Sequence, residues 1–300
     1  MGLQLPPRLR KVTLLTVASA GLLLLGACSA DDQAQIKRFA LPEPATDRAQ
    51  HVYDLWHGAW IAALIIGVLV WGLILYAAFA FRRRSDDEVP VQTRYNLPIE
   101  ILYTIAPIII VLVLFYFTVT VQNQVLAPAA SENGKDVSGD HQIEVVGYQW
   151  SWSFNYLKDD ALDGSTNVFT AGTTGDRPTL VLPVGESIDV TLVSPDVIHS
   201  FWVPAFLFKM DVVPGRHNSF TFTPTEKGTF DGRCAELCGT YHSRMLFDVK
   251  VVSPEDFATY LKSLEDQGNV GIARGGENVD TKVGLEPKSQ ADATTTEDAQ

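Results

Sequence analysis

The chain has 300 residues, of which 46% are hydrophobic and 19% charged, and its formal net charge is −12. This acidic balance argues against a nucleic-acid-binding protein, which needs basic side chains to replace phosphate counterions. The three cysteines are too few for a disulfide scaffold. The hydrophobic residues are concentrated near the N-terminus, so the sequence predicts membrane segments followed by a soluble domain.

The first apolar run, within residues 1–27, is typical of a secretory signal peptide. Basic residues from Arg8 to Lys11 precede it, as in the charged region of such signals. The tetrapeptide at 25–28 resembles a bacterial lipobox, which implies cleavage before Cys28 and lipidation of its thiol. Each methylene buried in the bilayer would then contribute about 0.8 kcal/mol to anchoring. A plain signal peptide with a chance cysteine is the alternative.

Two further runs, at residues 58–81 and 98–121, predict transmembrane helices. The first contains no charged side chain, and at about 1.5 Å rise per residue it crosses a hydrocarbon core of about 30 Å. Three arginines follow it, so the positive-inside bias places residues 82–97 in the cytoplasm. Residues 28–57 and everything after about 122 are then exoplasmic. Two buried helices of a soluble protein would need a larger core than this chain offers.

The remaining chain, residues 122–265, predicts an all-β exoplasmic domain. From about residue 141, short runs rich in Val, Thr, Phe and Trp alternate with turn residues, which favours a β-sandwich or barrel. Predicted strands cover 141–156, 179–182, 187–194, 217–223 and 245–252.

Three other segments complete the predicted domain organisation. Residues 157–178, rich in Asp, Gly, Ser and Thr, predict an inserted surface loop. A helix is expected over 254–264, with Ser253 as its N-cap. Residues 266–300 are polar and nearly free of aromatic side chains, so they predict a disordered tail.

A cluster of soft metal donors lies between Cys234 and Met245. Two thiolates (Cys234 and Cys238), the His242 imidazole and the Met245 thioether fall within twelve residues. Thiolate and thioether donors suit copper. Structural zinc prefers four Cys or His ligands, and a Cys234–Cys238 disulfide would leave His242 and Met245 without a role. His199, which follows an apolar strand and precedes an aromatic patch, is the candidate for a further ligand.

The spacing Cys-x-Glu-x-Cys-x3-His-x2-Met resembles the binuclear copper motif, CuA, of subunit II of the haem–copper cytochrome c oxidases. Residues 196–200 resemble the upstream ligand motif of that family. The resemblance covers almost the whole mature chain and implies a two-helix hairpin followed by a Greek-key cupredoxin sandwich. It implies these copper ligands: Cys234 and Cys238 as bridges, His199 and His242 as terminal ligands, Met245 and the Glu236 carbonyl as weak ligands.

The resemblance also assigns roles to residues outside the copper ligands. It implies that the Glu236 carboxylate binds a magnesium ion at the boundary with subunit I. Trp150 is expected to receive electrons above the copper site, while strand alternation would place it on one face with Tyr148 and Trp152. Glu100 matches a glutamate at the entrance of a proton channel, although a carboxylate at this place is often only an interfacial residue. Asp211 and Arg216 match residues at the subunit I interface.

The function implied by the resemblance is electron transfer in the bacterial plasma membrane. Electrons would pass from cytochrome c into the copper pair and then to haem in subunit I, where oxygen is reduced to water with proton pumping. Subunits I and III would be partners, and the cytochrome c donor would be soluble or membrane-bound, with a supercomplex as one possibility. The competing interpretation is a non-redox lipoprotein or copper chaperone. Quinol oxidase relatives typically lack the copper ligands present here.

Overall fold

The computed structural model describes residues 29–275, except positions 86, 87, 129, 133, 134, 138 and 163. The predicted signal peptide, the predicted lipidation of Cys28 and the predicted tail beyond residue 275 lie outside the described residues. The chain divides into two compact units, residues 1–43 and residues 44–300. The membrane helices and the β-domain therefore belong to one unit.

The first unit contains one described helix, α2 (Ala30–Lys37). It begins at Ser29, whose hydroxyl accepts a hydrogen bond from the Asp32 backbone N–H. The Asp32 carboxylate in turn accepts from the Ser29 backbone N–H, which completes a reciprocal capping box. Part of the predicted exoplasmic segment 28–57 is thus helical, although the sequence pattern does not predict a helix there.

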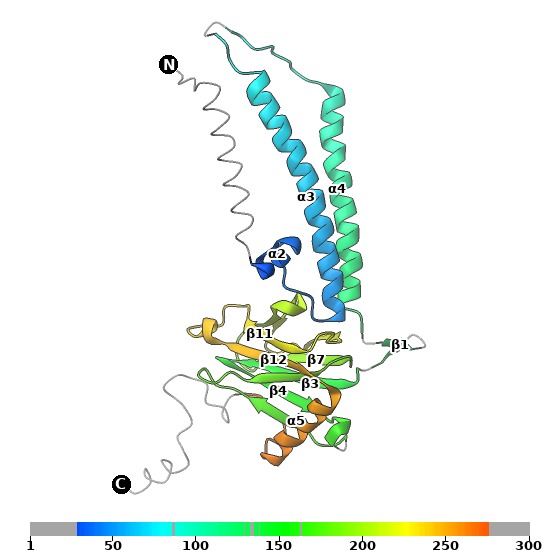
Figure 1. Ribbon diagram of the computed structural model, residues 1–300, viewed down its shortest axis with the longest axis vertical. Coiled ribbons are helices and arrows are strands. Elements are labelled where there is room, and N and C mark those ends of the chain that lie inside the picture. The colour runs from blue at the N-terminus through cyan, green and yellow to red at the C-terminus, as the bar shows by residue number, and fades with distance from the viewer. Residues whose placement is uncertain are drawn as a thin grey trace, which may run out of the picture. The chain divides into compact units, whose positions relative to one another are not determined.

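Two long helices, α3 (Asp47–Ala80) and α4 (Leu97–Val125), form the predicted membrane hairpin (Figure 1). Each contains an apolar window with a mean hydropathy of 2.5, and no residue of either window is buried in the protein. Such surfaces are stable only against lipid or other membrane subunits. Both helices extend beyond the predicted spans. The Thr46 hydroxyl accepts from the Ala49 N–H, so α3 begins eleven residues before Gly58.

A single arginine joins the exoplasmic ends of the two membrane helices. The Arg48 guanidinium, in the first turn of α3, donates to the carbonyl oxygen of Gln124 at 2.7 Å, near the end of α4. It also donates to the carbonyls of Ala127 and Pro128, each at 3.2 Å. The Gln124 carbonyl also accepts the Ala127 N–H at 3.4 Å, and the other two carbonyls follow the end of α4, so Arg48 adds a side-chain donor to each of the three. The residue therefore fixes the two helix ends to each other where the β-domain begins.

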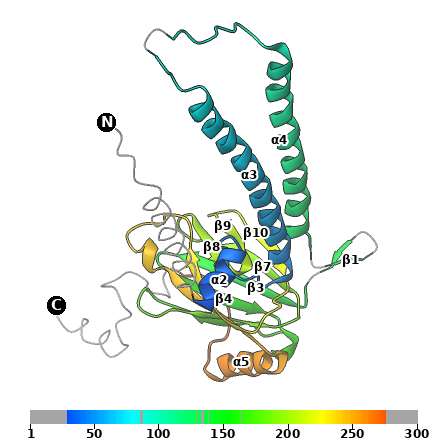
Figure 2. The ribbon, with the colours of Figure 1, turned by 45° about the horizontal axis from the view of Figure 1, so that its top comes forward.

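The β-domain is a sandwich of two five-stranded sheets, which confirms the predicted fold class (Figure 2). Its core contains the buried residues of both sheets, and β7 shows the alternation typical of a half-buried strand, with Ile188, Val190 and Leu192 inside. In spatial order the first sheet contains β10 (Asn218–Phe222), β7 (Ile188–Val193), β3 (His141–Tyr148), β4 (Ser151–Leu157) and β5 (Val168–Ala171). The second contains β6 (Thr179–Pro183), β12 (Leu246–Val252), β11 (Gly228–Cys234), β8 (His199–Val203) and β9 (Phe208–Val212).

Shorter elements connect or flank the sheets. A separate hairpin, β1 and β2, follows the second membrane helix, and three 3-10 turns lie between strands. The bounds are β1 (Ala130–Glu132), β2 (Lys135–Val137), η1 (Asp160–Leu162), η2 (Pro204–Phe206) and η3 (His242–Arg244).

The predicted strand at 141–156 is wrong in one respect: it is a hairpin of two strands. β3 ends at Tyr148, the chain turns at Gln149 and Trp150, and β4 returns antiparallel to β3. The turn is held because the Asp196 carboxylate accepts the Gln149 backbone N–H at 2.7 Å. Tyr148 pairs with Ser151 and Trp152 pairs with Gly147, so Tyr148 and Trp152 are not opposite each other, and Trp150 lies in the turn rather than on a strand face with them.

The predicted surface loop at 157–178 also contains regular structure. Within it, β5 pairs with β4 and extends the first sheet, and both Val168 and Leu162 are buried. The polar composition of residues 157–178 does not predict this strand, because only part of the segment faces the core. β9 and β11 were not predicted either. Their sequences mix charged residues or glycines with apolar ones, and tertiary pairing determines their structure.

The C-terminal helix α5 (Pro254–Asp266) begins where the sequence predicts it. The Ser253 hydroxyl accepts from the Asp256 N–H, and Phe257, Leu261 and Leu264 are buried against the sandwich. The predicted disordered tail is wrong for its first residues, because 267–275 pack on the first sheet. This segment is fixed by polar hydrogen bonds, and a search for apolar periodicity does not detect such contacts.

Candidate metal centre

The candidate metal ligands lie at one end of the second sheet, on the neighbouring strands β8 and β11 and in the loop from β11 to β12. β11 ends at Cys234, the following loop contains Cys238, and η3 begins at His242 and leads to β12. The loop is closed at its base by the Cys234 N–H, which donates to the Met245 carbonyl at 3.0 Å. The neighbouring strand β8 begins at His199 and lies beside Cys234, because Cys234 pairs with Phe201. The sheet register thus brings a histidine from residue 199 to a loop that begins 35 residues later.

The two cysteine sulfurs lie at the centre of the cluster. The Sγ atoms of Cys234 and Cys238 are 3.9 Å apart, and both thiols are free. A disulfide would require about 2.0 Å. Both side chains are buried, so the sulfurs face each other across a protected space. This separation leaves room for metal ions that both sulfurs contact.

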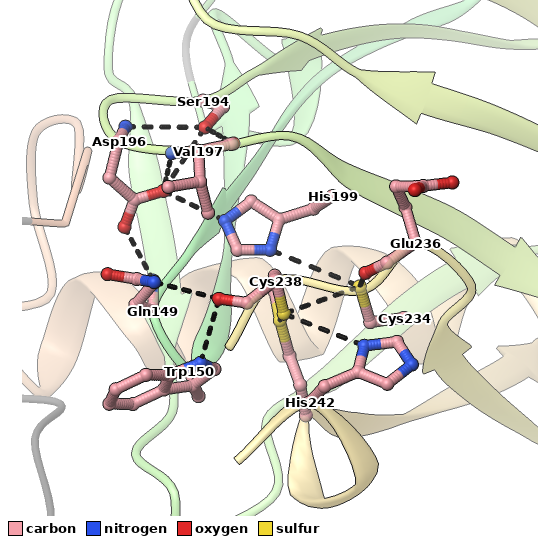
Figure 3. A network of polar contacts seen from close by, with 11 residues as sticks. Gln149, Trp150, Ser194, Asp196, Val197, His199, Cys234, Glu236, Cys238 and His242 are labelled. Atoms are coloured by element: carbon pink, nitrogen blue, oxygen red, sulfur yellow. Dashed lines mark hydrogen bonds and ion pairs between the residues drawn. The ribbon is translucent and has the colours of Figure 1, made fainter. Parts of the chain in front are cut away.

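The other four predicted donors lie around this sulfur pair, and Figure 3 shows His199, Glu236 and His242 among them. Each lies within 4.0 Å of one sulfur, and the donors include nitrogen, thioether sulfur and carbonyl oxygen. Nitrogen and soft sulfur in this combination fit copper. The distances to Cys234 Sγ are 4.0 Å from His199 Nδ1 and 3.2 Å from the Glu236 carbonyl, and those to Cys238 Sγ are 3.6 Å from His242 Nδ1 and 3.7 Å from Met245 Sδ.

His199 is oriented by a carboxylate that the sequence prediction did not single out as a functional residue. Its Nε2 lies 2.8 Å from Asp196 Oδ1, and its Nδ1 points toward the sulfurs (Figure 3). A carboxylate that holds one ring nitrogen of a ligand histidine fixes the ring and leaves the other nitrogen for the metal. The aspartate three residues before the histidine is the sequence signal that could have revealed this contact.

The electrostatics of the cluster favour the thiolate form of one cysteine. The hydrogen bond from the Cys238 thiol lowers the pKa of Cys234 far below its usual value, and this effect exceeds the opposing effect of burial. The same pairing and burial raise the pKa of Cys238. Burial also disfavours a charged His199, but the hydrogen bonds to Asp196 and Cys234 outweigh it and raise the pKa of that imidazole. Thiolates are the form that binds metal.

The turn between β3 and β4 contacts the metal loop directly. The Trp150 indole N–H donates to the Cys238 carbonyl at 3.1 Å, and the Gln149 side-chain amide donates to the same oxygen at 2.7 Å. Trp150 is half-buried and packs edge-on against Tyr241, with ring centroids 5.2 Å apart. The structure therefore places Trp150 at the rim of the donor cluster, one hydrogen bond from the backbone of Cys238.

Trp152 has a different position from Trp150. It is fully buried, and its ring packs edge-on against Phe247 and Phe201 in the core behind the site. Trp152 is therefore a core residue of the sandwich. Met210 is half-buried and packs against the same core.

The remaining predicted residues lie apart from the cluster. Glu100 is in the first turn of α4, where its carboxylate accepts the Asn96 N–H at 2.9 Å, at the end of the helix remote from the β-domain (Figure 1). Asp211 and Arg216 are exposed, at the end of β9 and in the turn after it. The structure thus brings together the six copper-ligand candidates and Trp150, but not Glu100.

The fold and the donor set together define a class. A β-sandwich follows a membrane hairpin, and one inter-strand loop and a neighbouring strand converge sulfur and imidazole donors. This is the class of membrane-anchored proteins with a cupredoxin-like domain, and the donor set is a candidate metal centre.

Comparisons with known proteins identify the family within this class. A family model described as "Cytochrome C oxidase subunit II, periplasmic domain" matches residues 141–252, and one for the transmembrane domain of the same subunit matches residues 34–121. The chain is 45% identical to the probable cytochrome c oxidase subunit 2 of Streptomyces avermitilis, over 90% of this chain and 92% of the relative. It is 36% identical to cytochrome c oxidase subunit 2 of Mycobacterium tuberculosis, over 86% and 83%.

Among solved structures, the chain is similar to the periplasmic domain of subunit II of cytochrome oxidase from Bradyrhizobium japonicum. The sequence identity is 33% and the TM-score 0.38, and the match covers 44% of this chain and 97% of that chain. The chain belongs to the cytochrome c oxidase subunit II family. It is a membrane protein with an exoplasmic cupredoxin-like domain, and the family implies a CuA-type copper site there.

Proposed function

We propose that this chain is the electron-accepting subunit of a proton-pumping haem–copper oxidase. It would take electrons from cytochrome c and pass them to haem in subunit I, where oxygen is reduced to water. The ligands of its binuclear copper centre would be Cys234, Glu236 (backbone carbonyl), Cys238, His242, Met245 and His199.

The convergence of these six donors carries the proposal. Every non-cysteine donor lies within 4.0 Å of one of the two facing sulfurs, and His199, Cys234 and Cys238 are buried. Copper held by these donors would supply one-electron chemistry at this site. The protein supports this because the loop, the sheet and Asp196 hold the donors in place.

Trp150 is the residue that we assign to electron arrival. Its ring lies at the rim of the cluster, and its N–H donates to the carbonyl of the ligand Cys238. An electron from a donor protein in contact with this ring would pass to the ligand loop through one hydrogen bond. The Gln149 amide, which shares the same carbonyl, holds the turn that presents the ring.

The other assignments follow from the family and from position. The Glu236 carboxylate would bind magnesium at the boundary with subunit I, while the backbone carbonyl of the same residue faces the Cys234 sulfur. Glu100 would lie at the entrance of a proton channel on the cytoplasmic side. Subunits I and III would cover the exposed apolar faces of α3 and α4. Lipidation of Cys28 would add a second membrane attachment.

The donor is cytochrome c, either as a soluble protein or as part of a membrane-bound supercomplex. The 157–178 segment extends the first sheet with β5, and its strand contacts β4, which follows the Trp150 turn. This extension of the first sheet beside the Trp150 turn favours a donor held in a larger assembly. Purification in mild detergent would show whether a membrane cytochrome accompanies the oxidase.

Rapid mixing of reduced cytochrome c with the purified oxidase tests this function. Trp150→Phe should slow reduction of the copper centre and leave its spectrum nearly unchanged. The matched control is Trp202→Phe, because Trp202 is also half-buried but packs under Arg233 on the other sheet. A Trp150 variant with normal reduction and an altered copper spectrum would reverse the assignment. An unmodified oxidase whose copper is not reduced by any cytochrome c would refute the function.

A further inference from the structure

The outer face of the β3–β4 hairpin differs from an ordinary sheet surface because its side chains are buried. Alternation along the two strands places three cross-strand pairs on this face, opposite the core: Glu144 with Asn155, Val146 with Ser153, and Tyr148 with Ser151. None of these six residues is more than 7% exposed. Because the outer face of an antiparallel sheet normally contacts water, another part of the chain must cover this one.

Residues 269–275, here termed the C-terminal strap, cover part of this face. The strap begins beside β5, where the Asn269 carbonyl accepts a backbone N–H of that strand at 3.0 Å. It then crosses β4, where the Asn155 side chain accepts the Ala273 N–H at 2.8 Å and donates to the Ala273 carbonyl at 3.0 Å. The Ser153 hydroxyl donates to the same carbonyl at 2.6 Å. Side chains of β4 thus fix the path of the strap toward β3.

The strap ends on the ring of Tyr148. A Cβ atom at Gly275 would lie 2.6 Å from two carbons of this ring, and the φ of Gly275 is +70°, so both the contact and the backbone favour glycine. One residue earlier, the Arg274 guanidinium lies 3.4 Å from the Glu144 carboxylate of the same strand. The strap therefore reaches β3 and closes over Tyr148.

Tyr148 joins the two ends of the turn that carries Trp150. Its backbone ends β3, and its hydroxyl donates to the Trp152 carbonyl of β4 at 3.1 Å. The same hydroxyl donates to the Gly172 carbonyl at 3.0 Å. The Tyr148 side chain therefore spans residues 149–151 and holds the turn closed from the outer face of the sheet.

The ligand loops hold the opposite side of this turn. The Asp196 carboxylate accepts the Gln149 N–H at 2.7 Å, and the Cys238 carbonyl accepts the Trp150 indole N–H at 3.1 Å. The fit is close, since a Cβ atom at Gly239 would lie 3.0 Å from the Trp150 ring. A small shift of the turn would therefore change the contact between the Trp150 ring and the ligand loop.

We propose that Tyr148 and the C-terminal strap form a positioning device for electron entry: the strap holds the Tyr148 ring against the hairpin, and Tyr148 holds the Trp150 indole on the Cys238 carbonyl. The inference rests on the proposed function and extends it to residues outside the ligand set. In the step concerned, one electron leaves reduced cytochrome c and reduces the copper centre, and no bond forms or breaks. The device acts on the rate of this step within the bound complex.

The variant Tyr148→Phe tests the device in the assembled oxidase. Rapid mixing with increasing concentrations of reduced cytochrome c separates the limiting first-order rate of copper reduction from the apparent Kd. We expect the limiting rate to fall by about tenfold, because a misplacement of about 1 Å can cost about 100-fold where orientation matters, and the ligand loops still hold one side of the turn. The apparent Kd should not change, since Tyr148 is buried.

The matched control is Tyr156→Phe. Tyr156 is also buried in the hairpin, but its hydroxyl bonds the Val181 backbone of the other sheet, accepting from the N–H at 2.9 Å and donating to the carbonyl at 3.2 Å. Loss of this hydroxyl should leave the limiting rate unchanged, although it removes two hydrogen bonds. Equal limiting rates in the two tyrosine variants would overturn the proposal.

A pair of glycine variants tests the strap separately. Gly275→Ala places a methyl group against the Tyr148 ring. Gly268→Ala, just before the strap, adds the same group at a φ of +80°, where it meets no atom within 4 Å apart from its chain neighbours. Gly275→Ala should lower the limiting rate as Tyr148→Phe does, and Gly268→Ala should not. Equal rates for the two glycine variants would show that the strap does not position Tyr148.

Further readouts distinguish failure of this inference from failure of the proposed function. The copper spectrum, the midpoint potential of the centre and its reduction by a small uncharged reductant should be the same in all these variants. A shifted spectrum or potential in Tyr148→Phe would contradict the device, because Tyr148 would then act on the ligand set. If Trp150→Phe slows reduction and Tyr148→Phe does not, only the device is refuted. If Trp150→Phe has a normal rate, the proposed entry point fails first and the device fails with it.

Discussion

Two histidines of the β-domain have opposite surroundings, and the difference shows what makes a histidine available to a metal. His199 bonds one carboxylate, Asp196, through Nε2, and its Nδ1 faces the two cysteine sulfurs. His141, at the start of β3, bonds carboxylates through both nitrogens, with Nδ1 2.6 Å from Asp159 and Nε2 2.7 Å from Glu186. No ring nitrogen of His141 remains for another partner.

The two sites therefore use the same side chain for different purposes. At His199 the carboxylate orients a ligand, whereas at His141 two carboxylates hold an imidazolium that connects three segments: β3, the loop that begins the 157–178 insertion, and the turn before β7. Burial alone would lower the pKa of His141, but the hydrogen bonds to Asp159 and Glu186 outweigh it and raise that pKa. His199 thus keeps one ring nitrogen for the candidate metal site, whereas both ring nitrogens of His141 are used within the fold.

Replacement of each histidine by alanine gives the largest expected contrast. His199→Ala should abolish the mixed-valence copper spectrum, because it removes a nitrogen donor beside Cys234. His141→Ala should retain the copper and its spectrum. Metal analysis and electron paramagnetic resonance of the two purified variants measure the difference. A normal copper signal in His199→Ala would break the distinction between the two histidines.

The orienting carboxylate should have a smaller effect than the ligand itself. Asp196→Asn keeps the size of the side chain but removes the charge that faces His199 Nε2. Loss of such a partner typically lowers metal affinity about 10–100-fold. The matched variant Asp159→Asn, beside His141, should leave copper affinity unchanged. Competition with a copper chelator measures both, and equal affinities for the two variants would contradict the orienting role.

The His141 cluster should contribute to the stability of the fold. His141→Gln leaves the buried Asp159 carboxylate without its charged partner, which should cost about 2 kcal/mol of unfolding free energy. His217→Gln, at an exposed histidine, should change stability by less than about 0.5 kcal/mol. Chemical unfolding of the full chain in detergent, followed by tryptophan fluorescence, compares the two. Equal stabilities would show that the carboxylates do not need the imidazolium.

The smallest expected effect is a pH dependence of this contribution. Because the folded pKa of His141 lies above its usual 6.5, its stabilisation is fully present below pH 6.5 and is lost as the pH rises through the folded pKa. The neighbouring Asp140 does not interfere, since hydrogen bonds from Ser187 lower its pKa below 3.8, outside this range. The midpoint of thermal unfolding should therefore fall between pH 6 and 9 more in the unmodified protein than in His141→Gln. Parallel curves would contradict the assignment.

The sequence predicted the parts of the molecule that local pattern determines. The two apolar runs, the Ser253 cap and the spacing from Cys234 to Met245 each depend on neighbouring residues, and the structure has the expected helices and donor loop there. Local pattern does not identify His199 as a ligand, because the register of β8 beside β11 is a long-range property. Only its aromatic neighbours and the family resemblance make His199 a candidate.

The features that the sequence did not reveal depend on contacts between distant segments. The turn at Gln149 is fixed by Asp196, 47 residues later, so the continuous aromatic run by itself predicts one strand. The sequence predicts a disordered tail at residues 267–275, because their partners, Asn155 and Ser153, are polar side chains more than 100 residues earlier. Local propensity carries no information on such pairs.

The metal content of the native oxidase tests the central claim most directly. This chain should hold a pair of copper ions that share one unpaired electron, which gives a purple mixed-valence spectrum with hyperfine coupling to two equivalent copper nuclei. Its thiols should be unavailable to alkylating reagents until the copper is removed. A single zinc ion, a blue mononuclear copper spectrum, or a Cys234–Cys238 disulfide in the active complex would contradict the account.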